Sequence, residues 1–197
     1  METILIVDDD KDLHVLIADI LHDEGYATIA VNTGRQALKI VNKKSLHVVL
    51  LDMKLPDMNG MNVLEEIKKL DDTAITIMLT AYGDVKDAVD AMKLGAYDYL
   101  TKPFDNEELV LVIKKALQTR YLSNEIENLK KLCESILQPI RNHYDAPVII
   151  SSGYRSPELC VVIGSSIDSQ HAKGCAADLQ VVGVDNKSLA KYIKENL

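Results

Sequence analysis

Apolar and polar positions follow two alternating patterns over the first hundred residues. Short apolar runs of strand length occupy residues 3–7, 26–31, 46–51, 74–79 and 97–100. Between them, apolar residues recur every three or four positions in residues 13–21, 33–42, 59–70 and 84–94, which is the spacing of an amphipathic helix. Continuous apolar runs are typical of strands that are buried on both faces. The pattern therefore predicts an α/β fold in which helices cover a parallel sheet.

Polar residues suited to chemistry directly follow four of the predicted strands. Asp8 to Asp10 follow the first strand, Asp52 the third, Thr80 the fourth and Lys102 the fifth. In parallel sheets, ligands bind beyond the carboxyl ends of the strands. Carboxylates that meet there repel one another or hold a cation, and hard oxygen donors favour Mg²⁺. The alternative is that the first aspartates only cap the following helix, but the other strand ends favour a shared site.

These strand ends resemble the receiver domain of two-component response regulators, and most of all the receivers of bacterial enhancer-binding activators. The similarity covers about residues 1–119. The matching segments are IVDDD at 6–10, DMKLPDMNG at 52–60, LTAYG at 79–83 and GAYDYLTKPF at 95–104. Each segment alone is weak evidence, but their order and spacing together are specific.

The resemblance implies a role for each residue at the strand ends. Asp52 would be the phosphoryl acceptor, attacking a phosphohistidine of a sensor histidine kinase or a phosphotransfer protein. The expected Mg²⁺ ligands are Asp8, Asp9, Asp52 and the backbone carbonyl of Lys54. The expected phosphoryl-contact and switch residues are Thr80, Ala81, Tyr99 and Lys102. Phosphorylation would then favour a pre-existing active conformation.

The expected fold of this part is flavodoxin-like, a doubly wound five-stranded parallel sheet in the order 2-1-3-4-5. This order places Asp8 and Asp52 on adjacent strands at the point where the strand order reverses. We expect a receiver domain over residues 1–119, a connecting helix over 120–137 and a smaller α+β domain over 138–197.

The connecting helix carries an apolar stripe with heptad spacing. Its members are Leu122, Ile126, Leu129, Cys133 and Ile136. The stripe is shorter than the roughly three to four heptads that a coiled coil requires. It either pairs two receivers in a dimer or packs on the domain that follows, and the sequence leaves both interpretations open.

The last sixty residues resemble the zinc D-alanyl-D-alanine carboxypeptidase family, which includes phage cell-wall peptidases. The matching segments are SGYRS at 152–156 and SQHAKGCAAD at 169–178, and the similarity begins near Asn128. The resemblance implies that His171 and Asp178 bind Zn²⁺ and that Arg155 contacts the substrate or the developing oxyanion.

The family pattern is incomplete in this part of the chain. A catalytic zinc needs three protein ligands and an open position, and in the family the third ligand and the general base come from a downstream Glu…His segment. The sequence ends at Leu197 before such a segment, so we expect a truncated peptidase-like domain. Cys175 and Cys160 are substitute ligands to consider, although buried cysteines usually act as small apolar residues. Two catalytic roles thus lack a candidate, and enzymatic activity stays undecided, with absence of activity favoured.

Composition and charge restrict the cellular location and the kinds of partner that we expect. The chain has 197 residues, a net charge of −8, 47% apolar residues and three widely spaced cysteines. No apolar run approaches the roughly 18 residues of a membrane span, and no signal peptide is evident. These features favour the cytoplasm, with no direct nucleic-acid partner and no disulfide framework. The expected function is a two-component response regulator whose output is dimerisation or partner binding; the alternative is a zinc cell-wall peptidase regulated by a receiver.

Overall fold

The computed structural model describes residues 2–197 except 44–45, 82–84, 153–169, 171–172 and 174. The chain divides into two compact units, Met1–Arg120 and Tyr121–Leu197. Each unit is considered by itself below. Within the described residues, no helix is both long and apolar enough to cross a membrane.

The first unit is built on a five-stranded parallel sheet. Its strands are β1 (Thr3–Val7), β2 (Ala27–Val31), β3 (Val48–Asp52), β4 (Ile75–Ala81) and β5 (Asp98–Lys102). Their order in the sheet is β2-β1-β3-β4-β5, and every neighbouring pair is parallel. Every residue of β3 is buried, as expected for a central strand that is covered on both faces. The predicted fold class and strand order are confirmed.

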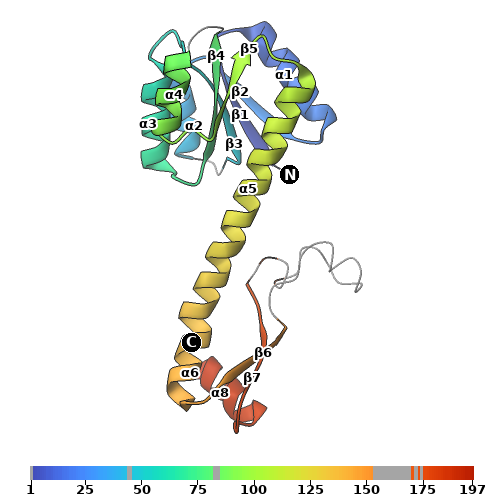
Figure 1. Ribbon diagram of the computed structural model, residues 1–197, viewed down its shortest axis with the longest axis vertical. Helices are drawn as coiled ribbons and strands as arrows, with labels where there is room; N and C mark the ends of the chain where they lie inside the picture. The colour runs from blue at the N-terminus through green and yellow to red at the C-terminus, as the bar shows by residue number, and fades with distance from the viewer. Residues whose placement is uncertain (1, 44–45, 82–84, 153–169, 171–172, 174) are drawn as a thin grey trace. The chain divides into compact units, whose positions relative to one another are not determined.

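Helices cover both faces of this sheet, and each face has its own core (Figure 1). The helices are α1 (Lys11–Asp23), α2 (Gly34–Val41), α3 (Gly60–Leu70), α4 (Val85–Lys93) and α5, which begins at Asn106. On one face, buried residues of α1 and α5 such as Ile17 and Ile113 pack on Ile4 and Leu50. On the other face, α2, α3 and α4 contribute Ala37, Val63, Leu64, Ile67 and Ala91. The alternation of the side chains of each central strand between two buried faces explains the continuous apolar runs in the sequence.

The second unit has a small core of its own. After α5 (Asn106–Leu132) come η1, a π-helical turn (Cys133–Leu137), α6 (Gln138–Tyr144), β6 (Val148–Ser152), β7 (Asp178–Val181) and α8 (Asn186–Asn196). β6 and β7 form an antiparallel pair. Ile140, Val181 and Leu189 are buried at the centre of this core. The unit thus joins helices to a two-stranded sheet, which needs such packing because an isolated strand pair is marginally stable.

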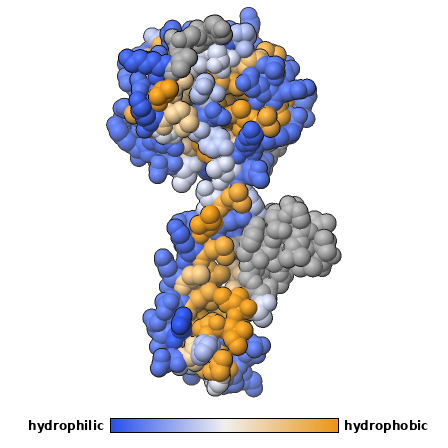
Figure 2. Space-filling view, in the orientation of Figure 1, coloured by the Kyte–Doolittle hydropathy of each residue, from blue (hydrophilic) through white to orange (hydrophobic). Residues whose placement is uncertain are grey.

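The heptad stripe meets two different environments. Ile136 packs against the core of the second unit, whereas Leu122 and Ile126 are about half exposed, at 49% and 56%. Ile149 and Val182 of the same unit are exposed as well, and Figure 2 shows apolar surface on this unit. The π-helical turn also breaks the regular spacing from Cys133 onward. The carboxyl-terminal end of the stripe therefore packs within its own unit, whereas Leu122 and Ile126 at its amino-terminal end are exposed.

Candidate functional site

Neighbouring strands bring the predicted site residues to one edge of the sheet. Val7 of β1 lies opposite Leu51 of β3, so Asp8 and Asp52 occupy the next position on each segment. On the other side of β3, the register of β4 and β5 places Ala81 opposite Lys102. All of these positions lie at the carboxyl ends of parallel strands, where the fold binds its ligands.

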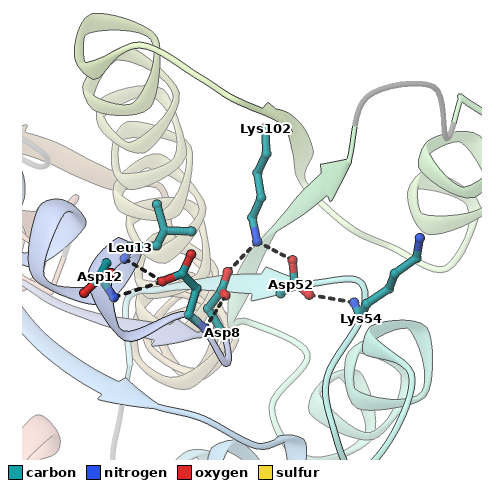
Figure 3. Close-up of polar contacts among 7 residues, drawn as sticks. Asp8, Asp12, Leu13, Asp52, Lys54 and Lys102 are labelled. Carbon is teal, nitrogen blue, oxygen red and sulfur yellow. Dashed lines mark hydrogen bonds and ion pairs between the residues drawn. The ribbon is translucent and has the colours of Figure 1, made fainter.

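Lys102 lies between the two aspartates and contacts both (Figure 3). Its Nζ donates to Asp8 Oδ2 at 2.6 Å and to Asp52 Oδ1 at 2.5 Å. The side chains of Asp8 and Asp52 are only 1% and 11% exposed, and that of Lys102 is 28% exposed. Two largely buried carboxylates thus share one ammonium group, an arrangement that leaves a net negative charge at the sheet edge.

Burial and the ion pairs act in opposite directions on the Asp52 carboxylate. Burial raises the pKa of Asp52, and the hydrogen bonds and charge of Lys102 reduce this rise without cancelling it. For Lys102, burial would lower the pKa, but the hydrogen bonds to Asp52 and Asp8 and the charges of these carboxylates together outweigh burial and raise it. The ammonium group therefore stays protonated at neutral pH. A carboxylate that is more basic than usual beside a fixed cation is suited to act as a nucleophile.

The loop after β3 supplies another contact to Asp52. The backbone N–H of Lys54 donates to Asp52 Oδ2 at 2.7 Å, as Figure 3 shows. Lys54 also forms an antiparallel bridge with Asn59, and the Gly60 N–H donates to the carbonyl of Met53 at 2.9 Å. The loop consequently folds back on itself beside Asp52 Oδ2.

The three aspartates after β1 have different roles. Asp10 caps α1, because its side chain accepts from the backbone N–H groups of Asp12 and Leu13 at 2.9 and 3.2 Å. Asp8 is buried and paired with Lys102, whereas Asp9 is exposed. The capping interpretation therefore holds for Asp10 and does not account for Asp8.

The donor atoms at this edge are of the kind that Mg²⁺ binds. Asp8 and Asp52 place carboxylate oxygens on either side of one cation, and Mg²⁺ takes one or two carboxylates and keeps several waters. Within the described ranges, no cluster of three or more His, Cys, Asp or Glu side chains could hold a metal ion. The two buried carboxylates fit the chemistry of Mg²⁺, while the parts of Asp9 and of the Lys54 carbonyl remain predictions.

The other predicted switch residues lie on β4 and β5. Thr80 is buried, at 2% exposure, and Tyr99 is 45% exposed. Ala81 is the last residue of β4, and the peptide bond between Lys102 and Pro103 is cis. The structure thus places Thr80 inside the sheet edge and Tyr99 on the surface, and their roles in switching remain predictions.

The predicted zinc site lies mostly outside the described part of the chain. His171, Arg155 and Cys160 are among the residues that the structure does not describe. Asp178 is the first residue of β7, opposite Ser152 of β6, and is exposed. Cys175 is exposed and free, so it is not the buried apolar residue that the sequence suggested.

Asp57 is not among the site residues predicted from the sequence, yet its carboxylate makes two contacts with α2. Oδ1 accepts from the Gly34 N–H at 2.9 Å and Oδ2 accepts from the Arg35 N–H at 3.1 Å. These partners lie 22 and 23 positions earlier in the chain. No local pattern reveals such a contact, because only the packing of α2 beside the loop brings the groups together.

Two family models match the chain. The response regulator receiver domain matches residues 4–114, and Peptidase M15 matches residues 102–197. The two matches overlap over residues 102–114, from the end of β5 into the first part of α5. The chain is thus a receiver fused to a region that is similar to M15 peptidases.

Relatives of known identity align with the receiver part. Sporulation initiation phosphotransferase F of Bacillus subtilis is 40% identical over 116 residues, which are 59% of this chain and 94% of the relative. An NtrX-like response regulator of Rickettsia bellii is 41% identical over 129 residues, 64% of this chain but only 27% of the relative. The chain therefore spans about a quarter of the length of such regulators.

Solved structures agree with these sequence matches. The receiver domain of NtrX from Brucella abortus aligns with a TM-score of 0.57 and 38% identity, covering 59% of this chain and 98% of that domain. The strand order and the acidic pair at the sheet edge agree with a receiver fold. The receiver family model also matches more than half of the residues. The chain belongs to the response regulator receiver family.

Proposed function

We propose that Asp52 is the phosphoryl acceptor of this response regulator. The observation that carries the proposal is the position of its carboxylate, which lies between the Lys102 ammonium group at 2.5 Å and the Lys54 N–H at 2.7 Å. An oxygen of Asp52 attacks the phosphorus of a phosphohistidine on a sensor histidine kinase or a phosphotransfer protein. The new O–P bond replaces the P–N bond, and the imidazole leaves with the electron pair.

The surrounding residues hold the transferred group and respond to it. Lys102 contributes a compact positive charge to a phosphoryl oxygen, and Thr80, next to Ala81, donates its hydroxyl to another. Asp8, Asp9, Asp52 and the Lys54 carbonyl are the residues proposed to hold Mg²⁺, which supplies positive charge beside the phosphoryl oxygens. Movement of Thr80 draws the exposed Tyr99 inward, and this rearrangement constitutes the switch.

The proposed output lies beyond the receiver. We assign phosphorylation to residues 1–119 and the output to 138–197, connected by 120–137. The exposed Leu122 and Ile126 of α5 offer an apolar surface for a second copy or another protein. Histidine kinases present their phosphohistidine in the cytoplasm, so the proposal places the protein there.

Labelling with a small phosphodonor tests the acceptor. With Mg²⁺ and radiolabelled acetyl phosphate, the wild-type chain should become labelled, and Asp52→Asn should reduce the label at least a hundredfold because the nucleophilic oxygen is lost. Asp71→Asn is the matched control, since Asp71 binds the Thr73 N–H in the loop before β4, at the amino end of the sheet. Persistent labelling of Asp52→Asn would contradict the assignment.

Asp52→Asn is expected to stay folded under the conditions of the labelling test. Because burial raises the pKa of Asp52, the folded state binds a proton there more tightly than the unfolded state. Stability is then gained as the pH falls through the folded-state pKa, and the ionised carboxylate costs stability above it. Asparagine removes that charge, so thermal unfolding at neutral pH should show no loss of stability and loss of label cannot be attributed to unfolding.

A second candidate function rests on the Peptidase M15 match. It assigns His171 and Asp178 to Zn²⁺ and Arg155 to substrate. Metal analysis of the purified chain tests this function. The function requires about one zinc per chain, loss of that zinc in Asp178→Ala, and cleavage of a D-Ala-D-Ala dipeptide. Protein without stoichiometric zinc or without cleavage would exclude this function and leave the second unit as a scaffold.

A further inference from the structure

The contact between the acceptor carboxylate and the Lys54 N–H depends on the loop that connects β3 to α3. This loop covers residues 53–59, and Lys54, Pro56 and Asn59 within it are exposed. An exposed loop samples several conformations unless hydrogen bonds or packing restrict it. The precision of the site therefore depends on what holds these residues.

Two of the restraints are local. The bridge between Lys54 and Asn59 and the Gly60 N–H to Met53 carbonyl bond close the loop on itself. Asn59 also caps α3, because its side chain accepts from the Met61 N–H at 2.8 Å. These contacts define the shape of the loop and join it to α3, while the Met53 N–H joins the start of the loop to the Leu79 carbonyl of β4 at 3.1 Å.

A third restraint reaches across to another helix. The Asp57 carboxylate spans the first two N–H groups of α2, with one oxygen on Gly34 and the other on Arg35. These donors are unsatisfied within the helix, and the positive end of the helix dipole favours an anion there. Burial would raise the pKa of Asp57, but the hydrogen bonds from Arg35 and Gly34 lower it, so the carboxylate is ionised at neutral pH.

Packing keeps α2 close to the loop and makes it a rigid anchor. Ala37 and Val41 of α2 are buried in the core on this face of the sheet. A Cβ atom added to Gly34 would come within 2.7 Å of the Met58 side chain and 2.6 Å of Val63, so the helix start touches both the loop and α3. Thr33 caps α2 separately by accepting from the Gln36 N–H at 3.3 Å. The helix therefore retains a cap of its own when Asp57 is removed.

We propose that Asp57 is a positioning residue for phosphorylation, which ties the loop to α2 so that the Lys54 backbone stays aligned with Asp52. The proposal rests on the proposed function, since it assumes that Asp52 accepts the phosphoryl group. Asp57 itself touches no reacting atom and acts through Lys54, three residues earlier. Without the hydrogen bonds of Asp57 to α2, the Lys54 N–H donates to Asp52 Oδ2 in a smaller fraction of molecules. The Lys54 carbonyl is then less well placed to bind Mg²⁺.

Removal of the carboxylate should slow the reaction without unfolding the protein. Small misplacements of reacting groups cost up to about a hundredfold in rate, and a loosened loop is a milder change. For Asp57→Ala we expect about a tenfold lower initial rate of labelling by acetyl phosphate at saturating donor. The half-saturating Mg²⁺ concentration should rise severalfold, and the KM for the donor should change little.

The matched controls separate positioning from simple stability. Thr33→Ala removes the cap of α2 but leaves the tie intact, so its labelling rate should be that of the wild type. Asp57→Asn keeps an oxygen acceptor for one of the two N–H groups and should recover part of the rate. Hydrogen exchange of the 53–60 segment, measured without metal, should be faster in Asp57→Ala and unchanged in Thr33→Ala.

Each outcome bears on a distinct claim. Equal losses of rate in Asp57→Ala and Thr33→Ala would show that stability of α2 is responsible and would overturn the proposal. A wild-type rate or unchanged exchange in Asp57→Ala would overturn it as well. Labelling of Asp52→Asn, or no labelling of the wild type, would instead refute the proposed function.

Discussion

Lys102→Met is expected to lower the free energy of unfolding of the metal-free receiver unit by about 2–3 kcal/mol. The substitution leaves Asp8 and Asp52, at 1% and 11% side-chain exposure, facing each other without a cation. Breaking a buried ion pair costs about 3–5 kcal/mol, and the partial exposure of Lys102 reduces this figure. Urea denaturation in the presence of EDTA, followed by circular dichroism, measures the change.

Another lysine of the same unit provides the control. Lys114 pairs with Glu24 at 2.7 Å, but its side chain is 53% exposed, so Lys114→Met should reduce stability much less than Lys102→Met. The pKa of Lys102 is raised in the folded state. Its contribution to folding stability is therefore complete at pH values below the ordinary lysine pKa and is lost only as the pH rises through the raised pKa. Addition of Mg²⁺ should restore part of the stability of Lys102→Met, and a loss no larger than that of the control would contradict the prediction.

Gly60→Ala should destabilise the receiver unit by about 3 kcal/mol. A Cβ atom at this position would lie 2.2 Å from the carbonyl oxygen of Asp52 and 2.9 Å from the Cα of Met53. Both atoms belong to the backbone where β3 ends and the loop begins, so no side chain can move aside. Thermal or urea unfolding would measure the loss, and the labelling rate should fall with it because the same backbone carries the acceptor.

Gly25→Ala serves as the comparison for this substitution. Gly25 has a φ of +85° and nothing within 4 Å of an added Cβ atom, so alanine there meets backbone strain alone, about 1 kcal/mol. Equal losses of stability in Gly60→Ala and Gly25→Ala would show that the short distance from Gly60 to the Asp52 and Met53 backbone is not the reason for glycine at this position.

Most of the receiver fold could be predicted because its strands are buried on both faces. Residues such as Val49 and Leu50 form uninterrupted apolar runs, and the helices between them have a regular apolar period, so element order and topology follow from general rules. Asp52 and Lys102 could be identified because each stands at the end of such a run, and parallel pairing brings these ends to one edge.

What could not be predicted depends on contacts between distant segments or on local context. Asp57 binds N–H groups more than twenty residues away, and Asp10 looks like Asp8 in sequence although it only caps α1. Pro139 lies in the first turn of α6, where the N–H that proline lacks is not needed for a helical hydrogen bond. Helical backbone therefore continues past residue 138, where the sequence predicts the start of the second domain.

The lysine that joins the two aspartates has a consequence for the Mg²⁺ binding that we propose. The Lys102 ammonium group already neutralises part of the negative charge of Asp8 and Asp52. Because it belongs to the chain, its concentration beside these carboxylates does not depend on the solution. A divalent ion that arrives from solution must compete with this tethered counter-ion for the same oxygens. The receiver is thereby less dependent on ambient magnesium for its folding, and its resting affinity for the ion is lower than two bare carboxylates would give.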